Sequence, residues 1–189
     1  MHPPSAEDDA AVIEGSMRRP ERFAVIFDRH AAHIQRYLTR RLGRQVADDL
    51  VAETFLVAFG RRAGYDQARP DARPWLYGIA TNLARQHQRT EVREYRLRAS
   101  VGPDPDQDGH ADRVAAQVTA AAMHRILAAA LAELSDGDRD VLLLIAWEDL
   151  SYDEVAEALA IPVGTVRSRL HRARRLVRAA LTKEPLNHG

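Results

Sequence analysis

Near its C-terminal end, the chain carries a helical pattern whose charge is almost entirely arginine. When residues 163–181 are placed on a helix of 3.6 residues per turn, one side becomes an apolar stripe of Val166, Leu170, Ala173, Val177 and Leu181. The other side is polar and basic, and no acidic residue occurs within residues 163–183. Guanidinium groups bind phosphates and can donate two hydrogen bonds to a guanine, which is the chemistry of a DNA-contacting surface. The candidate DNA-binding residues are Arg167, Ser168, His171, Arg172, Arg174, Arg175 and Arg178.

A shorter helical pattern, at residues 151–159, immediately precedes this arginine-rich segment. Ser151 and Glu154 have the spacing of a capping box, which marks the start of a helix. The turn Ala160-Ile161-Pro162 then interrupts the pattern. Two helices joined by a tight turn, the second short and basic, form a helix-turn-helix that places its second helix in the DNA major groove. The alternative is an amphipathic core helix with a solvated basic face, and the absence of balancing acids favours DNA binding.

A second set of residues with nucleic-acid chemistry lies within residues 73–89. Here Trp75 and Tyr77 stand at the head of a predicted helix that also carries arginines and amides. Aromatic faces stack on single-stranded bases, and amides and arginines reach the base edges. For Trp75 itself we favour packing in the core over stacking on a base. Gly78, in the interior of this helix, costs about 1 kcal/mol of helix stability. The candidate residues for single-stranded DNA are Trp75, Asn82, Arg85, Gln86 and Arg89.

A third pattern, at residues 48–59, combines acidic and apolar side chains on one predicted helix. Carboxylates near the start of a helix are favoured by the helix dipole. Carboxylates beside an apolar strip also form a complementary surface for a basic coiled coil. From the residues alone, we favour an ordinary amphipathic core helix with a solvated acidic edge. The candidate partner-binding residues are Asp48, Asp49, Glu53 and Phe55.

The elements that carry these residues are all predicted to be helices. Helical spacing is found at residues 23–42, ended by Gly43, at 48–59, at 75–89 with an extension toward Arg98, and at 114–134. Ser135 caps a further helix that ends near Trp147. Residues 101–110 hold prolines, glycines and aspartates and are predicted to be a flexible acidic linker. We therefore expect an all-α protein with a flexible leader (1–20), a first domain (21–98), a linker (99–113), a second domain (114–184) and a tail (185–189).

Composition excludes several classes of protein. The chain has no cysteine, which excludes disulfides, thiol catalysis and cysteine zinc sites. No apolar run approaches the length of a bilayer span, and the N-terminus is polar and acidic, so we expect a cytoplasmic protein. The eight histidines are scattered, and no H-E-x-x-H motif, glycine-rich phosphate loop or nucleophile elbow occurs. We therefore expect no enzymatic activity, no metal and no cofactor. The formal net charge is zero, but acidic and basic residues form separate blocks, and local charge decides a binding face.

The three segments, at residues 48–59, 73–89 and 134–181, occur in an order that resembles the sigma-70 family of RNA polymerase sigma factors. The resemblance is to the extracytoplasmic-function (ECF) group, which keeps only sigma domains 2 and 4, and it covers residues 23 to about 183. It implies that the chain binds core RNA polymerase and directs promoter-specific transcription initiation. The two domains would recognise the −10 and −35 elements and help to melt the DNA.

The resemblance also implies roles for the candidate residues. The acidic helix with Asp48, Asp49, Glu53 and Phe55 would bind the clamp helices of the largest polymerase subunit, while the flap of the second-largest subunit is a further contact. Residues from about Gly64 to Asn82 would capture a flipped base of the −10 element. Arg167, Ser168, His171 and Arg172 would read the −35 element, and Arg174, Arg175 and Arg178 would hold phosphates. We assign Arg169 instead to a structural ion pair with Glu154 or Glu157. In relatives, the linker threads toward the polymerase active site and the RNA exit channel.

Three other classes of protein fit the sequence less well. A stand-alone helix-turn-helix transcriptional regulator would need an α/β receiver or ligand-binding domain, and the first hundred residues contain no strand pattern. An enzyme lacks a supporting motif. An adaptor would not need two separate basic helices.

An anti-sigma factor is a further candidate partner of the sigma factor that the resemblance implies.

Overall fold

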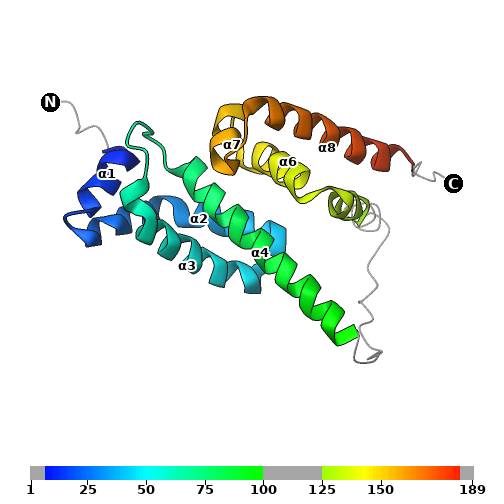
Figure 1. Ribbon diagram of the computed structural model, residues 1–189, viewed down its shortest axis with the longest axis horizontal. Helices are drawn as coiled ribbons and strands as arrows, with labels where there is room; N and C mark the ends of the chain where they lie inside the picture. The colour runs from blue at the N-terminus through cyan, green and yellow to red at the C-terminus, as the bar shows by residue number, and fades with distance from the viewer. Residues whose placement is uncertain (1–6, 100–124, 184–189) are drawn as a thin grey trace, which may run out of the picture.

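The computed structural model describes residues 7–99 and 125–183, and these residues form helices and turns without a strand. The N-terminal part contains α1 (Asp9–Ser16), the 3₁₀ turn η1 (Pro20–Phe23), α2 (Ala24–Leu42), α3 (Arg44–Arg61), the 3₁₀ turn η2 (Arg62–Gly64) and α4 (Arg73–Ala99). The C-terminal part contains α6 (Asp136–Glu148), α7 (Tyr152–Leu159) and α8 (Val163–Lys183), preceded by helical residues 125–133. The all-α prediction is confirmed (Figure 1).

The N-terminal bundle, α1 to α4, is organised around the packing of α2 against α3 and α4 (Figure 1). Gly43 separates α2 from α3 and adopts a φ of 84°, a left-handed conformation that favours glycine because it has no Cβ. This turn ends α2 where the sequence predicts. Tyr37, Leu38 and Leu76 are fully buried and belong to the hydrophobic core.

Helix α1 corrects the expectation that residues 1–20 are a flexible leader. Asp8 caps this helix by accepting a hydrogen bond from the Ala11 N–H at 2.8 Å, and Val12 and Ile13 are fully buried. The side chain of Asp9 fixes the helix to the bundle, since Arg29 donates to it at 2.8 Å. Because α1 has only eight residues and two large apolar side chains, its helical periodicity is too weak to predict a helix. The buried contacts of Asp9 join it to residues far away in the sequence, so no local pattern predicts them.

The C-terminal bundle, α6 to α8, begins at the helix cap that the sequence predicts. Ser135 Oγ accepts a hydrogen bond from the Asp138 N–H at 3.2 Å. The capping box of α7 is also present, with Ser151 and Glu154 each bonded to the other's backbone. Along α8, the first part of the apolar stripe is buried, whereas Val177 is half-buried and Leu181 is exposed.

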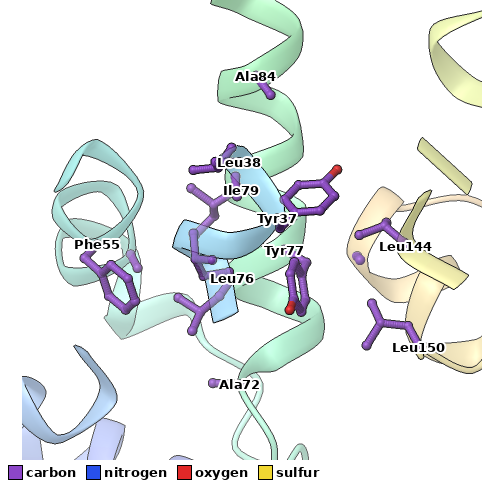
Figure 2. Packing of buried hydrophobic residues seen from close by; sticks show 14 of the residues in the cluster. Tyr37, Leu38, Phe55, Ala72, Leu76, Tyr77, Ile79, Ala84, Leu144 and Leu150 are labelled. Atoms are coloured by element: carbon purple, nitrogen blue, oxygen red, sulfur yellow. The ribbon is translucent and has the colours of Figure 1, made fainter. Parts of the chain in front are cut away.

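The two bundles share one continuous hydrophobic core. Figure 2 shows Leu144 and Leu150 of the C-terminal bundle facing Tyr37 and Tyr77 of the N-terminal bundle. Tyr37 and Tyr77 also pack edge-to-face, with ring centroids 5.5 Å apart. The second bundle therefore lies against α4, through α6 and α7.

Part of the sequence prediction lies outside the described residues. This applies to residues 100–113 of the acidic linker, to most of the predicted helix 114–134 and to the tail 185–189. Across the helices that are described, none combines the length and the apolar character that crossing a bilayer requires.

Candidate promoter and polymerase interfaces

The outer face of α8 presents the predicted DNA-binding residues to solvent. Val166, Leu170 and Ala173 anchor the opposite face of the helix in the C-terminal bundle and are at most 2% exposed. This burial fixes the rotation of the helix about its axis. The residues turned outward are Arg167, Ser168, His171, Arg172, Arg174, Arg175 and Arg178, all of which are exposed.

The turn before α8 sets the angle between the two helices of the helix-turn-helix. Ala160 has a φ of 51°, in the left-handed region, and its N–H bonds to the Glu157 carbonyl at 3.1 Å. The Ile161 N–H closes the turn on the Ala156 carbonyl at 3.0 Å. Pro162 directly precedes α8, and its carbonyl accepts a hydrogen bond from the Thr165 N–H at 2.8 Å. The predicted helix-turn-helix is present in the structure.

Arg172 is held by an acidic residue of the neighbouring helix. Its guanidinium donates two hydrogen bonds of 2.7 Å to the carboxylate of Asp138, in the first turn of α6. These hydrogen bonds lower the pKa of Asp138, outweighing the opposite effect of burial. The prediction that Arg172 reads a base therefore requires this ion pair to open. Its place in the structure is that of an anchor between α6 and α8.

Arg169 does not occupy the place that the sequence suggested. Its guanidinium lies so close to Gly137 that a Cβ at that glycine would meet Arg169 Nη1 at 2.6 Å. Glu154 instead bonds to the Ser151 N–H, and Glu157 pairs with Arg69 at 3.2 Å. The expected ion pair of Arg169 with Glu154 or Glu157 is thus wrong, because the side chain turns toward the start of α6.

The −10 candidates gather along one side of α4. Asn82, Gln86 and Arg89 are exposed and, with Arg85, line a groove of about 460 Å³. Spacings of three and four residues put these side chains on one face of the helix. The groove therefore brings four of the five predicted residues together.

Two −10 candidates are occupied by other contacts. Trp75 is partly buried at the start of α4 and packs on the ring of Tyr65 at 5.0 Å between centroids, in agreement with the preferred core role. Arg85 pairs with Asp140 of α6. Tyr65 is also bonded through its hydroxyl to the Arg69 carbonyl at 2.8 Å, which fixes the turn that leads into α4.

Helix α3 exposes its carboxylates but not its predicted aromatic residue. Asp48, Asp49 and Glu53 are exposed, and Asp48 accepts a hydrogen bond from Gln35 at 2.5 Å. Phe55 is only 6% exposed and packs edge-to-face on Phe27, with centroids 4.9 Å apart. The assignment of Phe55 to a partner-binding surface is corrected: its ring belongs to the core.

Leu56 is the exposed apolar residue that sequence reasoning missed. It is 71% exposed, the largest value among the large hydrophobic residues that the structure describes as exposed. It follows Asp49 by seven residues and Glu53 by three, so it shares their face of α3. The spacing of Leu56 from these two carboxylates could have identified it as exposed. Phe55, by contrast, lies on the buried side of the helix.

One cluster has the composition of a metal site. Oxygen and nitrogen atoms of Asp9, His30 and Asp71 lie within 4.8 Å of one another. The Asp9 carboxylate already contacts Arg29 and accepts from the Ala72 N–H at 3.0 Å, while His30 Nε2 lies 2.7 Å from its Oδ2. A guanidinium and a backbone donor on the same carboxylate satisfy its charge, and we assign the cluster to the docking of α1.

Comparison with known proteins identifies the chain. The family model described as Sigma-70 region 2 matches residues 26–94, and that described as Sigma-70, region 4 matches residues 124–177. The chain is 37% identical to the ECF RNA polymerase sigma factor SigL of Mycobacterium tuberculosis over 91% of its own length and 93% of SigL. It belongs to the ECF group of the sigma-70 family.

Further comparisons agree with this assignment. The sigma factor is 32% identical to the ECF RNA polymerase sigma factor SigW of Bacillus subtilis, over 84% of this chain and 88% of SigW. Its fold is similar to that of CnrH, solved in complex with the cytosolic domain of CnrY. In that case the TM-score is 0.66 at 24% identity, covering 94% of this chain and 99% of CnrH. Another similar fold is the sigma factor RpoE of Bartonella quintana, solved with the anti-sigma factor NepR (TM-score 0.61, 22% identity, 86% and 98% covered).

Family membership defines the biochemical role. This sigma factor binds core RNA polymerase and promoter DNA and directs transcription initiation. The stand-alone regulator is not favoured, because both sigma regions are matched in one chain.

Proposed function

We propose that the sigma factor binds polymerase and promoter DNA through three surfaces, which lie on two domains, residues 21–98 and 114–184. The exposed face of α3 binds polymerase, the groove on α4 binds the −10 element, and the outer face of α8 binds the −35 element. The observation that carries the proposal is the orientation of α8, whose apolar stripe is buried while its basic face is exposed.

At the −35 element, the first turns of α8 read bases in the major groove. Arg167, Ser168 and His171 are exposed near the start of the helix, where a helix-turn-helix meets base edges. Arg174, Arg175 and Arg178 lie further along and hold phosphates. Arg172 can contact a base only when its ion pair with Asp138 opens.

At the −10 element, the groove on α4 accepts single-stranded bases. Asn82 and Gln86 supply amides for base edges, and Arg85 and Arg89 supply charge for the backbone. Trp75 acts from the core, holding the turn that starts α4 through Tyr65. Extruding a base costs a few kcal/mol, so a rigid support for the groove favours melting.

At the polymerase, the carboxylates Asp48, Asp49 and Glu53, together with Leu56, contact the basic clamp helices of the largest subunit. An exposed leucine surrounded by carboxylates is suited to a centre of apolar contact with a charged rim. The C-terminal domain contacts the flap of the second-largest subunit.

The remaining assignments follow from the family role. The sigma factor acts in the cytoplasm, where polymerase and promoters are found, and it catalyses no reaction itself. An anti-sigma factor is a further partner of the same exposed surfaces. The similar sigma factor RpoE was solved in complex with such a factor, the anti-sigma factor NepR.

Charge reversal on α3 tests the polymerase surface. The double variant Asp49→Lys, Glu53→Lys should no longer retain core RNA polymerase in a pull-down, because it places positive charge opposite the clamp helices. Its circular dichroism should match that of the unchanged protein, since both residues are exposed. The control variant Glu14→Lys, Glu21→Lys makes the same change in net charge at exposed positions on α1 and η1 and should retain polymerase. Full retention by the folded α3 variant would rule out this surface.

A further inference from the structure

Asp9, at the start of α1, joins the N-terminal helix to the turn that leads into α4. Its carboxylate accepts a hydrogen bond from the Ala72 N–H at 3.0 Å, across 63 positions of the sequence. Its own backbone N–H donates to the Pro70 carbonyl at 3.0 Å. Figure 1 shows α1 beside this turn. One residue therefore binds an acceptor and a donor of the turn's backbone, on either side of Asp71.

Asp9 is itself held in place from a second direction. Its side chain is only 7% exposed, and Arg29 and His30 of α2 contact its two carboxylate oxygens. Val12 and Ile13, the two large apolar residues of α1, are fully buried. Helix α1 therefore cannot move without breaking these contacts, and Asp9 is a rigid point of attachment for the turn.

The other end of the turn is also held. The Tyr65 hydroxyl donates to the Arg69 carbonyl at 2.8 Å, and the Tyr65 ring packs on Trp75 with centroids 5.0 Å apart. Within the turn, the Asp66 side chain accepts a hydrogen bond from the Ala68 N–H at 3.0 Å. Contacts at both ends thus fix the backbone of residues 65–72.

The middle of this turn is nevertheless open to solvent. Residues 66–70 are all exposed, and Gln67 presents a side-chain amide among them. Loops that only connect two helices tolerate backbone freedom, whereas binding loops are held by a rigid support. An exposed segment with polar contacts fixing both ends is typical of the second kind, and amides hydrogen-bond to base edges.

The turn also sets where α4 begins. The Ala72 carbonyl accepts a hydrogen bond from the Leu76 N–H at 2.9 Å, so the contact between Asp9 and Ala72 reaches the first turn of the helix that carries the −10 groove. Asn82, the first residue of that groove, follows Ala72 by roughly 15 Å along the helix, at 1.5 Å per residue. A single strand of a few nucleotides can contact both the turn and the groove.

Stability alone does not explain a carboxylate at this position. Val12 and Ile13 already anchor α1 by burying apolar side chains. A buried carboxylate loses its hydration, and the ion pair that compensates adds little net stability compared with an apolar residue of similar size. The specific contribution of Asp9 is geometric, because its hydrogen bonds fix the position of one backbone segment relative to another.

We propose that Asp9 is a positioning residue for recognition of the −10 element. From α1 it fixes the turn of residues 65–72 and the start of α4, so that both are preorganised to accept an unpaired base. Preorganisation lowers the entropic cost of ordering a loop on binding. The proposal rests on the −10 surface assigned above and extends it to α1, which contributes no residue to the groove itself.

Binding of the holoenzyme to single-stranded DNA tests this role. The probe is the non-template −10 strand of a promoter that the protein transcribes, and a second probe lacks the base whose removal weakens binding most. Asp9→Ala should reduce the affinity ratio between the two probes by about tenfold, which corresponds to ordering the backbone of roughly one residue. Affinities for core polymerase and for duplex −35 DNA should be unchanged, because the side chain of Asp9 bonds to α2 and to the turn, and not to α3 or α8.

Two substitutions separate positioning from loss of charge. Asp9→Asn removes the charge but keeps an oxygen that can accept from the Ala72 N–H, so it should retain most of the affinity ratio. Arg29, which loses its ionic partner in this variant, is 33% exposed and can turn to solvent. Asp8→Asn is the matched control and should retain all of the ratio. It removes the same charge one residue earlier, at an exposed helix cap that asparagine also forms.

Two further variants separate positioning from loss of stability. Ile34→Val shortens a fully buried side chain of α2 and should lower the Tm without changing the affinity ratio. Tyr65→Phe keeps the ring on Trp75 but removes the hydrogen bond to Arg69 at the other end of the turn, and it should reduce the ratio as Asp9→Ala does. Equal reductions in Ile34→Val and Asp9→Ala, or an unaltered ratio in Asp9→Ala, would overturn the proposal.

Hydrogen exchange of the free protein tests the contact independently of DNA. Asp9→Ala should speed the exchange of the amides in residues 66–73, because the Ala72 N–H loses its acceptor, while Asp8→Asn should not. Exchange in this segment that is equal in Asp9→Ala and in the unchanged protein would contradict the fixing of the turn.

Asn82→Ala tests the −10 assignment itself. If it leaves the affinity for the −10 strand unchanged, the groove is not the −10 surface and the positioning role is refuted with it, while hydrogen exchange still reports whether Asp9 fixes the turn. If Asn82→Ala weakens binding and Asp9→Ala does not, the −10 assignment stands and only the role of Asp9 is refuted.

Discussion

At the residue scale, arginines of similar appearance in the sequence have different roles because their surroundings differ. Arg167 is exposed, whereas Arg172, five residues later, donates two hydrogen bonds to Asp138. The helical period of 3.6 residues correctly places both arginines on the basic side of α8. It gives no information about an acidic residue 34 positions earlier in the chain, at the start of another helix.

This difference predicts separate effects for the two arginines. Arg167→Ala should weaken binding of the holoenzyme to the −35 element by about 1–3 kcal/mol and relax discrimination at one base pair, without changing the Tm. Arg172→Ala should lower the Tm of the free protein, because Asp138 loses its partner. Binding competition with mutated −35 sequences and thermal unfolding measure the two effects. If Arg167→Ala lowered the Tm and Arg172→Ala did not, the structural role would belong to Arg167 and not to Arg172.

Phe55 and Leu56 are neighbours in the sequence with opposite environments. Phe55→Ala should lower the free energy of unfolding by roughly 3–5 kcal/mol, because it leaves a cavity beside Phe27. Leu56→Ser should change it by less than about 0.5 kcal/mol and should weaken binding to core polymerase. Chemical denaturation and polymerase titration distinguish them. A Leu56→Ser variant that is folded and binds polymerase normally would exclude Leu56 from the interface.

At the scale of the elements, the turn of the helix-turn-helix stores strain. Ala160 has a φ of 51°, and an L-residue in this region costs roughly 1–2 kcal/mol. Ala160→Gly should therefore stabilise the protein by about 0.5–1 kcal/mol, after the greater entropy of glycine in the unfolded chain is subtracted. Ala146→Gly, at an exposed position inside α6, should instead destabilise it by about 1 kcal/mol. Denaturant unfolding of both variants measures whether the free energy of unfolding rises in Ala160→Gly and falls in Ala146→Gly.

Docking of α1 should depend on pH. Burial alone would raise the pKa of the Asp9 carboxyl, but hydrogen bonds from His30, the Ala72 N–H and Arg29 outweigh it and hold the pKa well below its usual range. Since the unfolded value is about 3.9, the stabilisation is complete above roughly pH 4 and is lost as the pH falls toward the folded pKa. Hydrogen-exchange protection in α1 should fall roughly tenfold per pH unit below 4, relative to α2. Equal protection ratios at pH 6 and pH 3 would contradict this role.

The sequence predicted those elements whose apolar residues repeat with helical period, and it missed those held by individual polar contacts. Gly43, Ser135 and the capping box at Ser151 marked helix ends correctly, because these signals are local. Helix α1 was missed because a buried cluster around Asp9, contributed by three distant segments, fixes it.

At the scale of the whole molecule, zero net charge conceals an arrangement of opposite charges. Where the two bundles pack together, Arg41 of α2 and Arg85 of α4 face a carboxylate of α6, and Arg69, in the turn before α4, faces a carboxylate of α7. The basic face of α8 is exposed. No pattern in the sequence predicted that the two domains pack together. Gly78 was recognised only as a weak point of its helix, and the close approach of Ala158 supplies the reason for it.

We propose that the protein, together with core polymerase, selects promoters through two separate DNA-reading helices, α4 and α8. It is tested most directly by transcription in vitro, with core RNA polymerase on fragmented genomic DNA, followed by sequencing of the RNA 5′ ends. We expect starts that require the protein and share two sequence elements, near −10 and −35. Arg167→Ala should alter only the −35 element, and Asn82→Ala only the −10 element. Starts that are independent of the protein, or that share no −35 element, would contradict promoter selection by these two helices.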